Sequence, residues 1–263
     1  MGNHATARKH SRLIPHELTH THFFSDNWIM QRRDFIKVCA AGAAVSANDL
    51  FAAQGLNPRL YSRTQLTDEG GRPLRAASLI AGRNYIFHYP FESTPCFLLN
   101  LGRPTVRDVQ LRTEDGFTYQ WAGGVGPGRA IVGYSAICAH RMSYPTPQIS
   151  FISYREKSTA SGVMRANTIH CCSEHSEFDP AAGAKVVGGP APQPLAAILL
   201  EHDANNDALH AVGTLGGELF NAFFAKYEFK LAIDYGNGKT RQPAADRTVV
   251  KELQQFCKQQ VRC

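Results

Sequence analysis

Two short segments of the chain carry cysteine and histidine at spacings that suit a metal centre. The first is Cys138-Ala139-His140 and the second is Cys172-Ser173-Glu174-His175. Together they offer two thiolates and two imidazoles, which are ligands for iron–sulfur centres and for zinc. If each segment lies on a loop, and both loops lie at the same end of a β domain, the four side chains can converge on one small centre.

Two kinds of centre use this ligand set. A [2Fe-2S] cluster with mixed ligation takes two cysteines on one iron and two histidines on the other, which raises its potential above that of an all-cysteine cluster. A structural zinc ion also takes two cysteines and two histidines, but its cysteines are usually paired with each other across two to four residues. The single residue between Cys138 and His140 fits that zinc pattern poorly. We favour the cluster and keep a zinc-stabilised binding module as an alternative.

The residues around these ligands resemble the Rieske iron–sulfur family. The first segment is similar to the family's Cys-Thr-His-Leu segment, and the second, continued to Asp179, is similar to its Cys-x-x-His followed by an aromatic-Asp pair. Gly189-Pro190-Ala191-Pro192-Gln193-Pro194-Leu195 resembles the proline loop that covers the cluster in that family. The resemblance implies one [2Fe-2S] cluster per chain, bound by Cys138, His140, Cys172 and His175.

The chain departs from the family pattern in both ligand segments. Quinol-oxidising members carry an extra cysteine in each loop and join the two in a disulfide, whereas Ser143 and Glu174 stand at those positions here. The family's aspartate usually follows the ligand histidine by five residues, but Asp179 follows His175 by four. This shorter loop leaves Cys171 open as the ligand in place of Cys172. We favour Cys172, because a gap-free alignment from Asp179 would put Glu174 at the position of the nitrogen ligand.

A third departure concerns hydrogen bonds to the cluster. Phe178 stands where many high-potential members have a tyrosine whose hydroxyl bonds the cysteine sulfur. A hydrogen bond to sulfur stabilises the reduced cluster, so its loss lowers the potential. Ser176 offers another hydroxyl nearby, and we expect a middling potential.

Short apolar runs between turn signals predict the elements that position these segments. Each run has four to eight residues, as antiparallel strands do, and the runs cover Tyr85 to Tyr89, Pro95 to Leu101, Ala130 to Ile137, Ile149 to Tyr154, Thr168 to Cys171 and Ala196 to Glu201. We predict an all-β fold, with a Rieske-type antiparallel domain and a small cluster-binding subdomain over residues 72–215. A helical extension over 216–263 follows, with helices at 218–227 and 247–261.

The stretch from Met30 resembles a twin-arginine export signal. Arg32 and Arg33 precede a weakly apolar run of about ten residues, Val38 to Ala47, and a membrane-spanning helix needs about 20. We therefore predict a leader over 1–29, a signal over 30–53 and a linker over 54–71. The expected location is the periplasm or the periplasmic face of the inner membrane, with membrane association only through an uncleaved signal or a partner subunit.

Charge gives no sign of a nucleic-acid partner. The formal net charge is +6, but six of the 28 Lys and Arg and three of the 22 Asp and Glu precede Asn48, so the remainder carries +3. No run of basic residues with interleaved aromatics occurs after that point. The sequence predicts a mildly basic surface.

These observations predict a one-electron carrier or redox subunit. An oxygenase catalytic subunit would need a second site with two histidines and a carboxylate, and no histidine follows His210. The expected partners are a larger oxidoreductase and a cytochrome. A Rieske subunit of a cytochrome bc-type quinol oxidase is the alternative, which the missing loop disulfide disfavours.

Two further sets of residues invite other interpretations. Cys257 and Cys263 enclose five residues and could pair in an oxidising compartment. His202 and His210 lie near Asp203 and Asp207, which suggests a metal site or, more simply, a polar hairpin turn.

Overall fold

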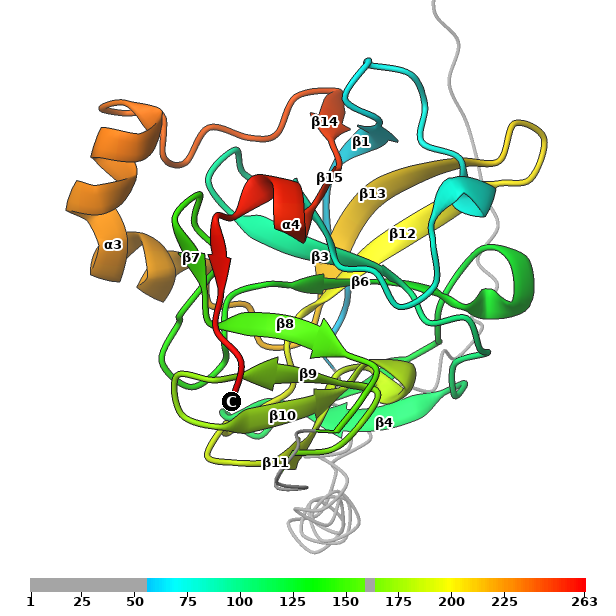
Figure 1. Ribbon diagram of the computed structural model, residues 1–263, viewed down its shortest axis with the longest axis horizontal. Helices are drawn as coiled ribbons and strands as arrows, with labels where there is room; N and C mark the ends of the chain where they lie inside the picture. The colour runs from blue at the N-terminus through cyan, green and yellow to red at the C-terminus, as the bar shows by residue number, and fades with distance from the viewer. Residues whose placement is uncertain (1–55, 159–163) are drawn as a thin grey trace, which may run out of the picture. The chain divides into compact units, whose positions relative to one another are not determined.

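The computed structural model describes residues 56–158 and 164–263 (Figure 1). The predicted leader over 1–29 and the predicted signal over 30–53 lie outside these ranges. None of the helices within the described ranges is long and apolar enough to cross a membrane.

An eight-stranded sheet forms the larger part of the fold, in the order β14-β1-β13-β12-β6-β3-β2-β15 (Figure 1). Its strands are β1 (Arg59–Thr67), β2 (Tyr85–His88), β3 (Pro95–Asn100), β6 (Ile131–Ser135), β12 (Ala197–Asp203), β13 (Ala208–Leu215), β14 (Arg247–Val249) and β15 (Lys251–Glu252). All neighbours pair antiparallel except β1 and β14, which pair in parallel.

One segment pairs with both edges of this sheet. In β14, Thr248 pairs with Leu66 of β1, and in β15, Lys251 pairs with Ile86 of β2. Only Val250 separates the two strands. The sheet therefore closes into a barrel, which leaves no long unpaired edge.

A smaller sheet carries the second ligand segment. It has the order β11-β10-β9-β8 and lies below the barrel in Figure 1. Its strands are β8 (Ile152–Arg155), β9 (Thr168–Cys171), β10 (Ser176–Asp179) and β11 (Lys185–Gly188). Two further pairs of strands accompany it, β4 (Val109–Arg112) with β5 (Thr118–Trp121) and β7 (Ile149–Ser150) with β16 (Gln259–Gln260).

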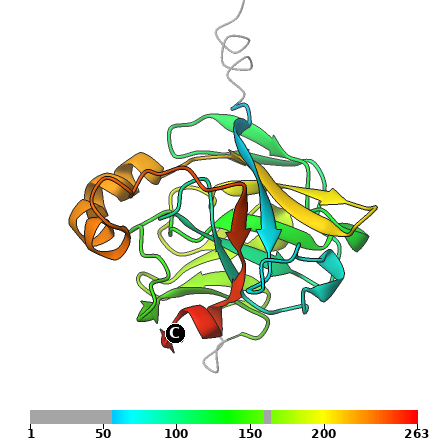
Figure 2. The same ribbon diagram turned by 90° about the horizontal axis from the view of Figure 1, so that it is seen from above.

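The helices are few, and most of them are short. Helix α3 (Phe220–Tyr235) is the longest of those described and projects to one side of the barrel, as Figures 1 and 2 both show. Helix α4 (Leu253–Phe256) has four residues, and the 3-10 turns are η1 (Ala76–Ser78), η2 (Pro127–Arg129) and η3 (Pro180–Ala182).

Three apolar clusters form the core. One includes Phe87 and Leu98 of the barrel strands β2 and β3. A second runs from the barrel to the smaller sheet and includes Tyr134, Ile169 and Phe178. The third packs α3 against the chain after β6. Burial of these side chains is the main force that holds the two sheets and α3 together.

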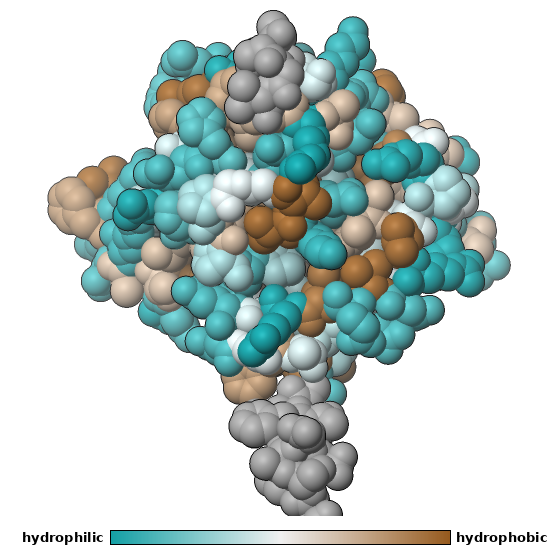
Figure 3. All heavy atoms as spheres, turned by 90° about the horizontal axis from the view of Figure 1, so that it is seen from below, coloured by the Kyte–Doolittle hydropathy of each residue, from teal (hydrophilic) through white to brown (hydrophobic). Residues whose placement is uncertain are grey.

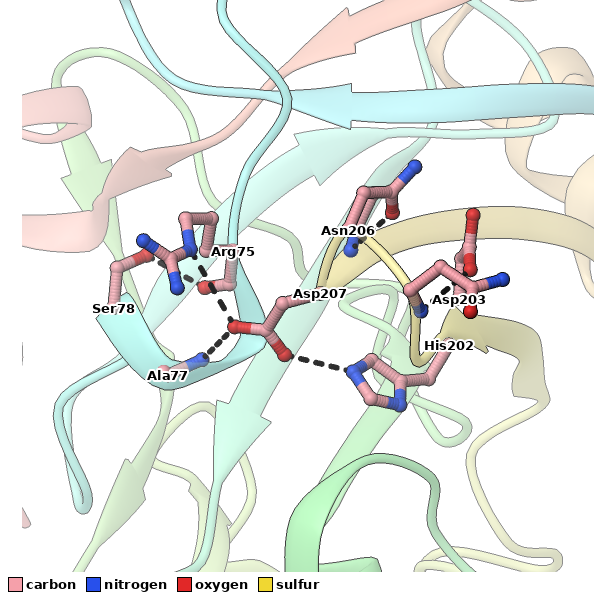
Figure 4. Close-up of polar contacts among 9 residues, drawn as sticks. Arg75, Ala77, Ser78, His202, Asp203, Asn206 and Asp207 are labelled. Atoms are coloured by element: carbon pink, nitrogen blue, oxygen red, sulfur yellow. Dashed lines mark hydrogen bonds and ion pairs between the residues drawn. The ribbon is translucent and has the colours of Figure 1, made fainter.

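A polar turn joins η1 to the hairpin of β12 and β13 (Figure 4). Asp207 Oδ2 accepts a hydrogen bond from the Ala77 amide at 3.0 Å and lies 3.8 Å from Arg75 Nε, while Oδ1 lies 2.8 Å from His202 Nε2. Asp207 has a φ of 61°, a left-handed conformation that aspartate tolerates in turns. The contacts favour the polar-turn interpretation of this region, since the Asp207 oxygens already have partners.

The all-β prediction is confirmed, and the structure differs from the detailed expectation in two places. The segment predicted as a linker over 54–71 contains β1, whose partner β13 lies far along the chain. The predicted helix over 247–261 is wrong, because that segment forms β14, β15, the short α4 and β16. Thr248, Val249 and Val250 are β-branched and favour strands. The partners of this segment are β1 and β2.

The face shown in Figure 3 is mostly hydrophilic, with separate apolar patches. Among the described residues, the most exposed large apolar side chains are Phe229, Leu60 and Ile233. Phe229 and Ile233 both belong to α3 and lie four residues apart, on one side of the helix.

Candidate metal centre

The first ligand segment forms a tight turn directly after β6. The Met142 amide donates to the Cys138 carbonyl at 2.9 Å, and the Cys138 amide donates to the Ser143 carbonyl at 2.9 Å. Met142 closes the turn with a φ of 56°. These bonds hold Cys138 and His140 on one compact loop, as the sequence predicts.

The second ligand segment is the turn between β9 and β10. Ser176 pairs with Cys171 across this hairpin, so Cys172, Ser173, Glu174 and His175 form the connection. His175 has a φ of 58° and its side chain is exposed.

The two loops meet through Cys138 and Cys171. Both cysteines are free and fully buried, and their thiols are close enough for each to shift the pKa of the other. The Ser143 hydroxyl lies 3.3 Å from Cys171 Sγ. Two thiols from segments far apart in the sequence are therefore side by side in an apolar setting.

The two thiols differ in proton affinity, with the pKa of Cys171 lowered and that of Cys138 raised. The hydrogen bond from Cys138 lowers the pKa of Cys171 to about 6, and the Ser143 hydroxyl and the amides of Ser173 and Glu174 act in the same direction. The pKa of Cys138 is raised because Cys138 donates to Cys171 and because it is buried. The first proton to leave the pair therefore leaves from Cys171.

Cys172 does not join this pair. It forms a disulfide with Cys263, with a Cα to Cα distance of 5.5 Å. A sulfur in a disulfide is not a thiolate and cannot bind iron. Cys172 therefore does not offer the free thiolate expected of it, and Cys171 is the free cysteine next to this turn. The possible pairing of Cys257 with Cys263 does not form, since Cys263 is bonded to Cys172 and Cys257 is a free, buried cysteine.

The first histidine has a ring nitrogen that no residue of the described ranges satisfies. His140 Nδ1 is buried and has no hydrogen-bond partner among the described residues. A buried polar atom without a partner is costly, and such atoms commonly mark a place where an ion or another group binds. The second histidine, His175, is exposed on the facing loop.

At the two positions where quinol-oxidising Rieske proteins have their extra cysteines, this chain makes other contacts. Ser143 lies against Cys171 Sγ, as described above. Glu174 Oε1 lies 3.6 Å from Arg141 Nε, and this ion pair joins the second loop to the first. Both partners of the pair are largely exposed, so it contributes little to stability.

The proline-rich segment after β11 lies against the second loop. Gly189 has a φ of 77°, and a Cβ added there would lie 2.3 Å from the His175 carbonyl oxygen and 2.6 Å from Ser176 Cα. Only glycine allows this close backbone approach. Further along, the buried Gln193 accepts a hydrogen bond from the Glu114 amide at 2.9 Å and donates one to the Gly217 carbonyl at 3.2 Å, which anchors the segment.

Helix α3 supports the first loop from behind. The Tyr144 and Phe223 rings meet edge to face with centroids 4.8 Å apart, and Ile137 belongs to the same buried cluster. Lys226 Nζ donates to the Arg141 carbonyl at 2.6 Å. The predicted aromatic face of this helix therefore packs on the loop that carries Cys138 and His140.

The structure brings together only part of the expected ligand set. Cys138 and Cys171 lie next to each other. Across the described residues, no three or more Cys, His, Asp or Glu side chains are placed to share one metal ion, so neither His140 nor His175 joins this pair in one group. A structural zinc site needs four ligands around one ion, and a mixed-ligand [2Fe-2S] cluster needs two protein ligands on each iron.

Some participants were not identified from the sequence. Cys263 is 91 residues from Cys172, so no local pattern links the two. The strand period of two does not separate Cys171 from Cys172, because β9 ends at Cys171 and Cys172 begins the turn.

No protein-family model matches the chain. Among solved structures, the chain is similar to the crystal structure of the soluble domain of the Rieske protein II (soxF) from Sulfolobus acidocaldarius, with a TM-score of 0.39 and 26% sequence identity. The match covers 59% of this chain and 78% of that chain.

Proposed function

We propose that this chain is an exported one-electron carrier that holds one Rieske-type [2Fe-2S] cluster. Cys138 and Cys171 are the ligands of one iron, and His140 and His175 are the ligands of the other. The observation that carries the proposal is the contact between two buried free thiols from separate loops, each of which also bears a histidine.

The residues of the site fit such a group in two respects. The thiols are soft ligands held in a dry, apolar cluster of side chains, and His140 Nδ1 is a buried nitrogen without a partner among the described residues. When bound, a cluster of this kind accepts and releases one electron. The protein exchanges only that electron, so no substrate pocket is required.

The proposed ligands differ in exposure, and this difference indicates the side on which a redox partner would approach. Cys138 and Cys171 are fully buried, whereas His175 is exposed at the tip of the β9–β10 hairpin. The histidine side of the site is therefore the side on which a redox partner would dock. As partners we propose a larger oxidoreductase and a cytochrome.

The competing functions have weaker support. The single residue between Cys138 and His140 fits a structural zinc site poorly. An oxygenase catalytic site would need two further histidines and a carboxylate, and no histidine follows His210. A quinol-oxidising Rieske subunit of the cytochrome bc type would have a disulfide between the two loops, and Ser143 and Glu174 occupy those positions.

Export rests on two independent observations. One is the twin-arginine resemblance of Arg32 and Arg33 in the sequence. The other is the Cys172–Cys263 disulfide, since disulfides persist in oxidising compartments such as the periplasm.

Replacing Arg32 and Arg33 with lysine should trap the precursor in the cytoplasm. Cell fractionation of the full chain in a bacterial host with a twin-arginine system measures this, and replacing Arg8 and Arg12 of the predicted leader is the control. Normal export of the Arg32→Lys, Arg33→Lys variant would contradict the proposed route.

Analysis of the purified protein tests the cluster itself. We expect two irons and two acid-labile sulfides per chain, and an electron paramagnetic resonance signal in the reduced state with the low average g value of mixed Cys and His ligation. A colourless protein containing one zinc per chain would instead support the binding module.

A further inference from the structure

The Cys172–Cys263 disulfide ties the second ligand loop to a segment far along the chain. We call residues 257–263 the C-terminal strap. Cys172 is adjacent to Cys171, and Cys263 lies at the other end of the bond, with a Cα to Cα distance of 5.5 Å. Neither of these two cysteines belongs to the thiol pair at the candidate metal centre.

Backbone hydrogen bonds seat the strap along β7. The Gln259 amide donates to the Gln148 carbonyl at 3.1 Å, and the Val261 amide donates to the Ser150 carbonyl at 2.9 Å. Arg155 Nη2 of β8 donates to the Val261 carbonyl at 2.8 Å. The strap is therefore fixed to the smaller sheet before the disulfide joins it to Cys172.

The position of Cys172 determines which thiol faces Cys138. Cys171 is the last residue of β9 and is fully buried, whereas Cys172 begins the turn that follows, is partly exposed and is bonded to the strap. The Cys172 amide also donates to the Phe151 carbonyl at 2.7 Å. A slip of one residue at this point would exchange the two cysteines between the faces.

We propose that the Cys172–Cys263 disulfide is a redox-sensitive clamp that fixes the register of the second ligand loop. This inference rests on the proposed function for its consequence at the cluster. The clamp holds Cys172 outward and removes its thiol from competition, so that Cys171 alone faces Cys138. Cys172 and Cys263 are positioning residues in this scheme and do not bind iron.

The clamp opens by an ordinary exchange reaction. A dithiol reductant attacks the disulfide, the sulfur–sulfur bond breaks, and two electrons and two protons pass from the dithiol to Cys172 and Cys263. The products are two protein thiols and the oxidised, cyclic reductant. Both cysteines are partly exposed, so a small dithiol can reach them.

Hydrogen exchange of the full chain tests the clamp directly. Variant Cys263→Ser removes the bond, and variant Cys257→Ser is the matched control, since Cys257 is a free cysteine of the same strap. We expect the Cys172 and Val261 amides to exchange about tenfold faster or more in Cys263→Ser. Without the disulfide, no covalent bond limits the local opening of the loop and the strap. Wild-type protein treated with dithiothreitol should match Cys263→Ser, and Cys257→Ser should match untreated wild type.

Iron release gives a second readout at the cluster. A ferrous chelator should remove iron several-fold faster from Cys263→Ser than from wild type or Cys257→Ser. Dithiothreitol should accelerate the loss in wild type but not in Cys263→Ser, which separates opening of the clamp from direct action on the cluster.

The two proposals fail in different ways. If the protein contains no cluster, the proposed function fails, and the hydrogen-exchange comparison still decides whether the clamp holds the loop. Equal exchange rates in wild type and Cys263→Ser, with the disulfide verified in wild type by non-reducing peptide mapping, would overturn the clamp.

Discussion

At the scale of single residues, the pairing of β9 with β10 decides which side chains face the site. Cys171 pairs with Ser176 and Ile169 pairs with Phe178, so these four side chains share one face of the hairpin. All four are buried. His170 and Glu177 form the pair between them and lie on the opposite face.

Ser176 is the residue most suited to tune the potential. Its hydroxyl is buried beside Cys171 and has no hydrogen-bond partner among the described residues. A hydroxyl that donates to a ligand sulfur favours the reduced cluster. Ser176→Ala should therefore lower the potential by about 40 mV, which corresponds to about 1 kcal/mol for one electron.

Protein-film voltammetry measures this change, with Ser173→Ala as the control because Ser173 is an exposed residue of the same turn. An unchanged potential in Ser176→Ala would show that the hydroxyl does not reach the cluster.

At the scale of elements, the ligand loops are held by neighbours other than their own strands. Helix α3 packs on the first loop through Phe223 and Tyr144. The segment after β11 packs on the second loop through Gly189. The chain therefore braces both loops by packing.

Gly189→Ala should loosen the second loop. The added methyl group would overlap the His175 carbonyl and force a positive φ on alanine. We expect a loss of about 1 to 3 kcal/mol in the free energy of unfolding, measured by urea denaturation, together with a lower iron content.

Gly71→Ala is the matched control. Gly71 has a φ of 75°, close to that of Gly189, but nothing lies within 4 Å of an added Cβ. Gly71→Ala therefore has the same cost of a positive φ on alanine as Gly189→Ala, but its added methyl group overlaps no neighbouring atom. Equal stability and equal iron content in the two variants would argue against close packing at His175.

At the scale of the whole described domain, long-range pairings complete the fold. The segment with β14 and β15 closes the barrel, and the strap that follows pairs with β7 through β16. The turn around Asp207 fixes η1 to the β12–β13 hairpin (Figure 4).

The Asp207 turn should make stability depend on pH. The hydrogen bond from the Ala77 amide, followed by the contact with His202, lowers the pKa of Asp207 below its ordinary value. A lowered pKa in the folded state means that ionised Asp207 stabilises the fold. That contribution is complete above the ordinary pKa of about 4 and disappears as the pH falls through the folded value.

Asp207→Asn should therefore lower the free energy of unfolding by about 1 kcal/mol at neutral pH. Asparagine has the same shape and tolerates the positive φ, so the change isolates the charge. The difference from wild type should shrink as the pH falls below the ordinary pKa and vanish below the lowered pKa of folded Asp207. Asp115→Asn, at an exposed site, is the control, and a pH-independent difference for Asp207→Asn would refute the electrostatic explanation.

Local sequence patterns predicted the parts of this fold that depend on local contacts. The predicted strand over Thr168 to Cys171 matches β9, and the aromatic repeat after Gly217 matches α3. The sequence did not reveal β14, β15 or the Cys172–Cys263 bond, because each depends on a partner far along the chain. The sequence does not settle the choice between Cys171 and Cys172 for a related reason, since spacing alone does not say which of two adjacent cysteines is buried.

The central claim is that Cys171, and not its neighbour Cys172, completes the thiolate pair with Cys138. Iron content and the electron paramagnetic resonance spectrum of freshly purified Cys171→Ser and Cys172→Ser test it most directly. We predict that Cys171→Ser is colourless and free of iron, while Cys172→Ser keeps two irons per chain and the low average g value of a mixed-ligand cluster. A colourless Cys172→Ser beside an intact Cys171→Ser would contradict this account of the site.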